Sequence, residues 1–255
     1  MSKYKGYLID LDGTMYKGDE VIPEAAPFIT RLAERNIPYV FVTNNSTKST
    51  HDVAEKLNHL GIQANANQVV TSSMATANYL KDQLIETCYC IGQSGLKDAL
   101  EKQGIQLVDA IHVDAVVVGM DKDITYDKLA TACIAIRNGA AFISTNRDHA
   151  IPTENGMGPG NGAFTALVQT STQQDPVFIG KPDTIIMNEA LEVLGLPKED
   201  VLMVGDNYQT DIQSGFNAEV DTLFVHTGVT KKEELSTLEK QPTYIIENLS
   251  EWNME

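Results

Sequence analysis

Two aspartates near the start of the chain, Asp10 and Asp12, follow a short apolar run at residues 7–9. Carboxylates placed so closely at the end of a buried strand repel each other, and burial penalises both charges. A divalent cation or a phosphoryl group with cationic neighbours would offset that cost. Because alternate residues of a strand point to the same side, both carboxylates could converge on one ligand. The Asp-Gly pair is also typical of a surface turn, so the motif needs partners elsewhere.

Further polar side chains follow three later apolar runs. The run at 39–42 is followed by Thr43, Asn44 and Asn45, and the run at 176–179 leads to Lys181. The run at 201–204 is followed by Asp206 and Asp211. Together these segments supply carboxylates, hydroxyl and amide donors, and a lysine.

The elements that must position these residues alternate between strands and helices. Nearly continuous apolar runs at 7–9, 39–42, 69–70, 115–118, 141–143, 176–179, 201–204 and 222–225 predict strands covered on both faces. Helical spacing at 23–36, 52–60, 96–103, 126–138 and 183–194 predicts the helices between them. Glycines 61, 104, 139 and 195 follow four of these segments and indicate left-handed helix ends. This order predicts an α/β fold with a doubly wound parallel sheet, whose ligands bind at the carboxyl ends of the strands.

Phosphoryl transfer would use each of these groups. A carboxylate can attack phosphorus only when its repulsion from the phosphate is neutralised, which Mg²⁺ and a lysine can do. We expect Asp10 to be the nucleophile that forms an aspartyl-phosphate. Asp12 would protonate the leaving alkoxide and then activate water. Both residues would also contribute to the metal site.

The later residues would bind the metal and the phosphate. Asp206 is expected to hold Mg²⁺, and Asp211 to bind it directly or through water. Thr43, with the backbone N–H of Asn44, would bind phosphate oxygens, and Lys181 would stabilise the transferring group. Each residue alone also fits a simpler role: a helix cap for Thr43, a solvated lysine, a turn at Asp206, and a first-turn acid at Asp211.

Taken together, the motifs resemble those of the haloacid dehalogenase superfamily. The matching segments, in the same order, are residues 10–14 (DLDGT), Thr43, residues 180–183 (GKPD) and residues 205–211. The sequence Thr-Asn-Asn-Ser at 43–46 further resembles the NagD-like, class IIA phosphatases. The resemblance implies a Rossmann-like core, Mg²⁺, and hydrolysis of phosphate monoesters. It makes Asn45 a further candidate phosphate-binding residue.

Spacing predicts a second domain inserted in the core. Lys181 lies 138 residues after Thr43, far more than one or two crossovers require. We therefore expect a catalytic core at 1–79 and 177–255 and an inserted α/β cap at 80–176. In class IIA relatives such a cap closes over the site. The cap would carry Asn146, Arg147 and a glycine-rich loop at 156–162 that either cradles substrate or is a plain turn. Relatives often have proline where this chain has Arg147, which could pair with a substrate carboxylate or be a solvated arginine.

Composition limits the partners and the location. The net charge of −16 argues against nucleic acid or an anionic membrane surface as a partner. Three cysteines without zinc-ligand spacing are expected to be reduced and mostly buried. The start of the sequence shows no signal-peptide pattern, and no apolar run is long enough to span a bilayer. These features predict a cytoplasmic protein.

We therefore expect an Mg²⁺-dependent phosphatase of small phosphorylated metabolites, with sugar or acid-sugar phosphates as the first substrates and nucleoside monophosphates as the alternative. A phospho-accepting receiver would be about half this length, and an aspartyl-phosphate ATPase would lack Asp12. A non-catalytic metabolite-binding protein would not need Asp10, Asp12, Lys181 and Asp206 together. The resemblance also makes a homodimer plausible.

Overall fold

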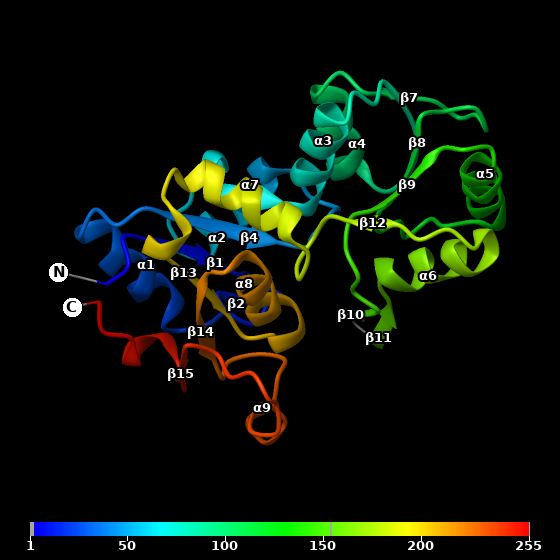
Figure 1. Cartoon of the computed structure of the whole chain (residues 1–255). Helices are drawn as coiled ribbons and strands as arrows, with labels where there is room; N and C mark the ends of the chain where they lie inside the picture. Colours follow the sequence, from blue (N-terminus) through cyan, green and yellow to red (C-terminus); the bar gives the residue numbers. More distant parts are fainter. Residues whose placement is uncertain (1–2, 154, 255) are drawn as a thin grey trace. The chain divides into compact units, whose positions relative to one another are not determined.

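The computed structural model describes residues 3–153 and 155–254, and these residues form two compact α/β units (Figure 1). The first unit takes residues 1–43, 50–70 and 181–255, and the second takes residues 44–49 and 71–180. The main segment of the second unit thus runs from residue 71 to residue 180, whereas the sequence suggested a cap at 80–176. The helix α3 (Ser72–Asp82) accounts for most of the difference, because it packs against α4 (Ser94–Lys102) of the second unit.

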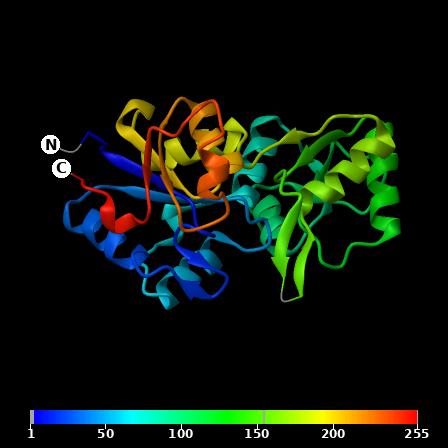
Figure 2. The same ribbon diagram turned by 90° about the horizontal axis from the view of Figure 1, so that it is seen from below.

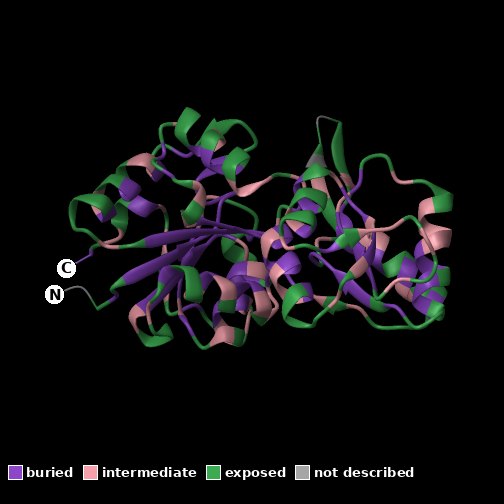
Figure 3. Cartoon of the chain, turned by 90° about the horizontal axis from the view of Figure 1, so that it is seen from above, coloured by how far each residue is buried: buried purple, intermediate pink, exposed green. Residues whose placement is uncertain are grey.

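The first unit is built on a six-stranded sheet. Parallel pairings join β1 to β13 and β4, and continue from β13 through β14 to β15. The apolar runs of the sequence form the inner strands, whose residues are almost all buried (Figure 3). The strand order is β15 (Tyr244–Ile246), β14 (Asp221–Val225), β13 (Val201–Gly205), β1 (Gly6–Ile9), β4 (Tyr39–Thr43) and β5 (Val69–Thr71).

Helices cover both faces of this sheet. On one face, Phe28 of α1 (Ala25–Glu34) and Leu57 of α2 (Thr50–His59) share an apolar core with Tyr7 and Ile9 of β1. On the other face, α7 (Thr184–Leu194) contacts β4 and β1, and α8 (Gln213–Ala218) contacts β14. This arrangement confirms the predicted doubly wound α/β class. Shorter elements are β2 (Tyr16–Lys17), β3 (Glu20–Val21), α9 (Lys232–Leu235), a π-helical turn (Tyr208–Ile212) and 3₁₀ turns at Ala66–Gln68, Lys198–Asp200 and Leu249–Glu251.

The second unit has its own five-stranded parallel sheet. Its α5 (Tyr126–Arg137) and α6 (Asn161–Thr172) pack against each other, and Ala132 and Val168 share a core with Val116 and Val118. The strand order is β12 (Val177–Phe178), β9 (Ala141–Ser144), β8 (Ala115–Val118), β6 (Thr87–Ile91) and β7 (Gln106–Leu107).

The glycine-rich segment is not a plain turn, and its contact with substrate stays a prediction. Residues 156–159 form β11 (Gly156–Pro159), which pairs antiparallel with β10 (Ala150–Thr153), and the hairpin extends from the second unit as two green ribbons (Figure 2). The next glycines begin α6. A Cβ atom on Gly162 would lie 2.3 Å from the carbonyl oxygen of Arg147, so this glycine permits close backbone packing.

Several local predictions agree with the structure. Glycines 61, 104, 139 and 195 have φ between 70° and 104° and follow α2, α4, α5 and α7, as expected of left-handed helix ends. Cys88 and Cys133 are buried and Cys90 is partly buried, and all three are free thiols. Across the described residues, no helix combines the length and apolar character that a bilayer crossing requires.

Candidate active site

The carboxyl ends of two neighbouring strands place the first pair of acids. Asp10 follows β1 and Asp206 follows β13, and the backbone N–H of Asp10 donates to the carbonyl oxygen of Val204 across 2.9 Å. On its other side β1 pairs with β4, so the order of the strands changes direction at β1. Open α/β sheets bind ligands at the carboxyl ends of the strands beside such a change. Thr43, the last residue of β4, is buried at this same sheet edge.

A third acid completes a buried cluster. Oxygen atoms of Asp10, Asp206 and Asp211 all lie within 4.8 Å of one another. Asp211 sits in the π-helical turn after β13, and its Oδ2 accepts the backbone N–H groups of Asp206 and Asn207 at 3.2 and 3.0 Å. The turn thus directs the Asp211 carboxylate toward the cluster and away from solvent.

Lys181 is the cation of this cluster. Its side chain is 2% exposed, and its Nζ donates to Oδ1 of Asp10 at 2.5 Å and to Oδ1 of Asp211 at 2.8 Å. A further bond of 3.0 Å reaches the carbonyl oxygen of Val42. The solvated-lysine alternative is therefore wrong. The sequence also suggested that Lys181 ends a strand of the core sheet, but the preceding strand, β12, belongs to the second sheet.

Burial and repulsion control protonation in the cluster. Burial and the nearby Asp211 carboxylate raise the pKa of Asp10 well above its usual range, although Lys181 opposes this. The same two causes raise the pKa of Asp206 to about 7, against hydrogen bonds from Val229 and Thr14. Burial lowers the pKa of Lys181, but Asp10 and Asp211 outweigh it and the pKa is raised overall. The lysine therefore stays charged while Asp10 and Asp206 resist ionisation.

The cluster fits a hard divalent cation. Three carboxylates face a lysine, so full ionisation leaves uncompensated negative charge inside the protein. Oxygen donors are the ligands that Mg²⁺ and Ca²⁺ prefer, and one or two carboxylates with substrate oxygens suffice for Mg²⁺. Asp10, Asp206 and Asp211 could therefore hold such an ion.

Asp12 differs from the other acids. Its side chain is exposed, and the carboxylates that cluster among the described residues do not include it. The predicted convergence of Asp10 and Asp12 on one ligand, and the contribution of Asp12 to a metal site, stay predictions. Gly13 turns the chain here with φ of 95°, and the backbone of Asp12 pairs with that of Tyr16. Desolvation raises the pKa of the Asp12 carboxyl although much of the residue is exposed, and Lys56 on α2 opposes that increase.

Sequence reasoning missed the residues that surround Asp206. Thr14 was noted only as part of a motif, yet its hydroxyl donates to Oδ1 of Asp206 at 2.9 Å. The loop at residues 227–230 follows β14, and the N–H of Val229 donates to Oδ2 of Asp206 at 2.7 Å. A signal was present, because this Thr-Gly-Val-Thr segment follows the next strand along the same sheet edge.

The other predicted site residues belong to the second unit. Asn44 and Asn45 lie in its 44–49 segment, and Asn146 is buried after β9, where its Nδ2 donates to the carbonyl oxygen of Asn44 at 2.9 Å. Oδ1 of Asn45 accepts the backbone N–H of Thr47 at 2.8 Å, as in an Asx turn. These contacts give Asn146 and Asn45 local structural roles, and their binding roles stay predictions.

Arg147 is exposed, and its guanidinium carbon lies 3.8 Å from the ring centre of Phe178. This stacking holds the cation against an aromatic face, so part of the side chain is fixed before any ligand arrives. Phe178 ends β12, three residues before Lys181 in the sequence.

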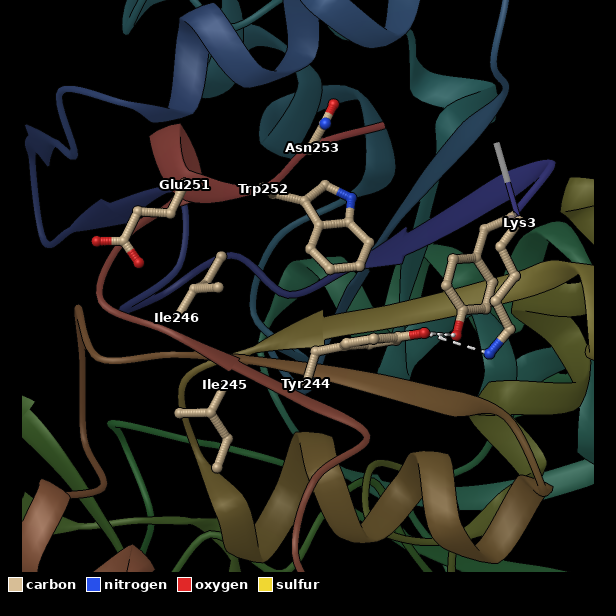
Figure 4. A pocket seen from close by; sticks show the side chains of 8 residues that line it. Lys3, Tyr244, Ile245, Ile246, Glu251, Trp252 and Asn253 are labelled. Carbon is tan, nitrogen blue, oxygen red and sulfur yellow. Dashed lines mark hydrogen bonds between the residues drawn. The ribbon is translucent and has the colours of Figure 1, made fainter. Parts of the chain in front are cut away.

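A separate cavity of about 410 Å³ lies beside β15 and the segment before β1 (Figure 4). Lys3 and Tyr4, which precede β1, line it with Tyr244 and Trp252. Nζ of Lys3 donates to Oδ2 of Asp221 at 2.9 Å and to the hydroxyl of Tyr244 at 3.3 Å. None of the clustered acids lines this cavity, so it is not the site at Asp10.

Comparison with known proteins agrees with the fold. Residues 7–106 match the model of the haloacid dehalogenase-like hydrolases, and residues 178–252 match a second HAD-hydrolase-like model. The chain is 56% identical over 252 residues to the acid sugar phosphatase of Staphylococcus saprophyticus, covering 98% of this chain and 97% of that protein. It is 53% identical over 253 residues to the 5′-nucleotidase YutF of Bacillus subtilis, covering 99% of this chain and 98% of that protein.

A solved structure gives the same result. A double mutant of a thermostable NPPase from Geobacillus stearothermophilus superposes with a TM-score of 0.95, at 52% identity and with 100% of both chains covered. The chain therefore belongs to the haloacid dehalogenase-like hydrolases. These relatives confirm the predicted NagD-like class and the enzyme class, a hydrolase that acts on phosphate monoesters.

Proposed function

We propose that the chain is an Mg²⁺-dependent phosphatase of small acid-sugar or sugar phosphates, which reacts through an aspartyl-phosphate on Asp10. The observation that carries the proposal is the buried contact of Lys181 with Asp10 and Asp211, beside Asp206. A lysine and a cation site around one carboxylate are what attack on a phosphate dianion requires.

The acids of the first unit would hold the metal. Asp10, Asp206 and Asp211 offer the oxygen atoms, and when bound the ion would offset the charge of the substrate phosphate. Lys181 holds Oδ1 of Asp10, which leaves Oδ2 as the attacking atom. Thr43, and the backbone N–H of Asn44, would bind the remaining phosphate oxygens.

The reaction would proceed in two displacements. Oδ2 of Asp10 forms a bond to phosphorus while the bond from phosphorus to the leaving oxygen breaks, and the carboxyl of Asp12 gives that oxygen its proton. The Asp12 carboxylate then takes a proton from water, and the water oxygen attacks phosphorus. Breaking the bond between phosphorus and Asp10 releases inorganic phosphate and restores the nucleophile.

The relatives suggest the class of substrate. The Staphylococcus protein is named an acid sugar phosphatase and the Bacillus protein a 5′-nucleotidase. We place acid-sugar phosphates first because Arg147, stacked on Phe178, is a preoriented cation that a sugar carboxylate could bind in bidentate fashion. Nucleoside monophosphates are the second candidate. In this proposal the second unit is the cap that selects substrate, with Asn146 and Asn45 contributing to binding.

Hydrolysis of p-nitrophenyl phosphate tests the chemistry. We expect activity that needs Mg²⁺, stops with EDTA and falls about 1,000-fold or more in Asp10→Asn, because the amide cannot form the phosphoenzyme. Asp200→Asn is the matched control, since Asp200 pairs with Lys5 outside the cluster. Activity of Asp10→Asn equal to that of the wild type would exclude the mechanism.

A substrate screen tests the specificity. Wild type and Arg147→Ala are compared on acidic sugar phosphates, neutral sugar phosphates and nucleoside monophosphates. We expect Arg147→Ala to lose about 10-fold or more in kcat/KM on the acidic substrates only, the cost of one charged pair. Equal losses on all substrates would contradict a carboxylate contact. The predicted homodimer and cytoplasmic location are separate proposals, which light scattering and cell fractionation can test.

A further inference from the structure

The side chain of Asp206 is held by donors from two separate segments. The hydroxyl of Thr14, a fully buried residue, donates to Oδ1 at 2.9 Å. The backbone N–H of Val229 donates to Oδ2 at 2.7 Å. A carboxylate has about four lone-pair positions, so one donor on each oxygen fixes the plane of the group and leaves positions for a metal.

The loop at residues 227–230 is itself bound to both strand ends. The hydroxyl of Thr227 donates to the carbonyl oxygen of Gly13 at 2.7 Å, next to Thr14. The hydroxyl of Thr230 accepts the N–H of Tyr208 at 2.9 Å, two residues after Asp206. The loop thus links the turn after β1 to the turn after β13.

Close packing leaves the Asp206 carboxylate little room to rotate. A Cβ atom on Gly228 would lie 1.8 Å from its Oδ2, and one on Gly13 would lie 2.4 Å from the same atom. Backbone atoms of both segments therefore lie against the carboxylate, where any side chain would displace it. The hydrogen bonds and the packing fix one orientation.

We propose that Thr14 and the loop at residues 227–230 are positioning residues that set the affinity of the site for a divalent cation through Asp206. The inference rests on the metal-dependent function proposed above. Groups that orient a metal ligand contribute about 10- to 100-fold to metal affinity. Because neither group is proposed to contact substrate, their loss weakens metal binding more than it slows the metal-saturated enzyme.

Calorimetric titration of the substrate-free protein with MgCl₂ tests the proposal. Thr14→Val keeps the shape and removes the donor, and it should weaken Mg²⁺ binding about 10-fold or more, while Thr14→Ser restores it. With saturating Mg²⁺, the KM of Thr14→Val for p-nitrophenyl phosphate should stay within about twofold of wild type. The matched control is Thr222→Val, a fully buried threonine of the same unit whose hydroxyl accepts the N–H of Thr243.

Unchanged Mg²⁺ affinity in a folded Thr14→Val protein would overturn the inference. If circular dichroism shows that this variant does not fold, Thr227→Val decides instead, because Thr227 is only partly buried and its loss should also weaken Mg²⁺ binding. Equal weakening by Thr222→Val would show a general loss of stability and would also contradict the proposal. A wild-type protein that neither binds Mg²⁺ nor hydrolyses the ester would contradict the proposed function itself.

Discussion

At the scale of single residues, Lys181 links Asp10 to the rest of the cluster. It is buried between Asp10 and Asp211, and its charge opposes the repulsion between them. Removing one charge of a buried ion pair leaves its partner buried without compensation. The resulting loss of stability exceeds the stability that the pair itself contributed.

Replacing Lys181 should therefore reduce both stability and activity. We expect Lys181→Met to lower the free energy of unfolding of the metal-free protein by about 3–5 kcal/mol, the cost of leaving buried charges unpaired. Added Mg²⁺ should recover part of that loss, because a cation at the carboxylates replaces the lost charge. Urea unfolding with EDTA and with MgCl₂ measures both effects, and Lys5→Met, which removes an exposed ion pair, is the control.

Asp12 allows a test of the second displacement. Asp12→Asn cannot activate water, but p-nitrophenolate is a good leaving group that needs little protonation. The variant should therefore release about one equivalent of p-nitrophenolate per site in a rapid burst and then turn over slowly. Stopped-flow absorbance and acid-quenched phosphoenzyme measure this result. Steady-state release without a burst would argue against a role for Asp12 in the hydrolysis of the phosphoenzyme.

At the scale of elements, the site depends on turns that leave three neighbouring strands. β1, β13 and β14 all end at one edge of the sheet, and the turns that follow them meet at Asp206. Parallel pairing supplies this convergence, since it places the carboxyl ends of all three strands together.

Gly228 tests how tightly these turns must pack. Gly228→Ala places a methyl group where Oδ2 of Asp206 lies, so we expect the carboxylate to shift and kcat at fixed Mg²⁺ to fall about 10-fold or more. Gly61→Ala is the contrasting variant, because a Cβ there meets no atom within 4 Å although φ is 77°. It should lower the melting temperature by a few degrees through backbone strain and leave kcat unchanged. Equal kcat values for the two variants would show that crowding at Asp206 is unimportant.

Element types were predicted where the hydrophobic pattern was strong. The buried strands β1, β4, β8, β13 and β14 are continuous apolar runs, and glycines mark the ends of four helices. The strand β6 was missed because its sequence, Thr-Cys-Tyr-Cys-Ile, lacks a continuous aliphatic run. The hairpin at 150–159 was missed because glycine and proline signal turns more often than strands.

At the scale of the whole molecule, we expect the acidic cluster to make stability depend on pH and on bound metal. The folded state holds the Asp206 proton up to about pH 7, whereas an unfolded aspartate releases it near pH 4. The folded state therefore binds more protons between these values, and the stability of the metal-free protein should fall as pH rises through this window. Asp10, whose pKa is raised in the same direction, adds to the effect.

Metal should reverse this trend. Mg²⁺ binds ionised carboxylates, so it should raise the melting temperature more at about pH 8 than at about pH 5. Thermal unfolding with EDTA and with saturating MgCl₂ at both pH values measures the difference. Asp206→Asn should flatten the pH dependence of the metal-free protein. A metal effect that is equal at both pH values would contradict binding at the cluster.

The sequence by itself determined the fold class and indicated most of the polar groups that lie at the strand ends. Apolar runs predict the parallel strands, and the Asp or Thr residues that follow them mark the carboxyl ends of those strands. Both the apolar run and the polar residue after it can be read locally in the chain. These signals placed Asp10, Thr43 and Asp206 at strand ends, and the spacing from Thr43 to Lys181 indicated an inserted unit.

Only the tertiary structure decided which groups meet. It ties Lys181 to both Asp10 and Asp211, and it brings Thr14 and the 227–230 loop to Asp206. Thr14 and Asp206 are 192 positions apart. The pattern along a chain reports burial and turns, whereas such contacts depend on strand order and on how each turn leaves its strand. The acids and Lys181 were therefore visible in the sequence, and the groups that hold Asp206 were not.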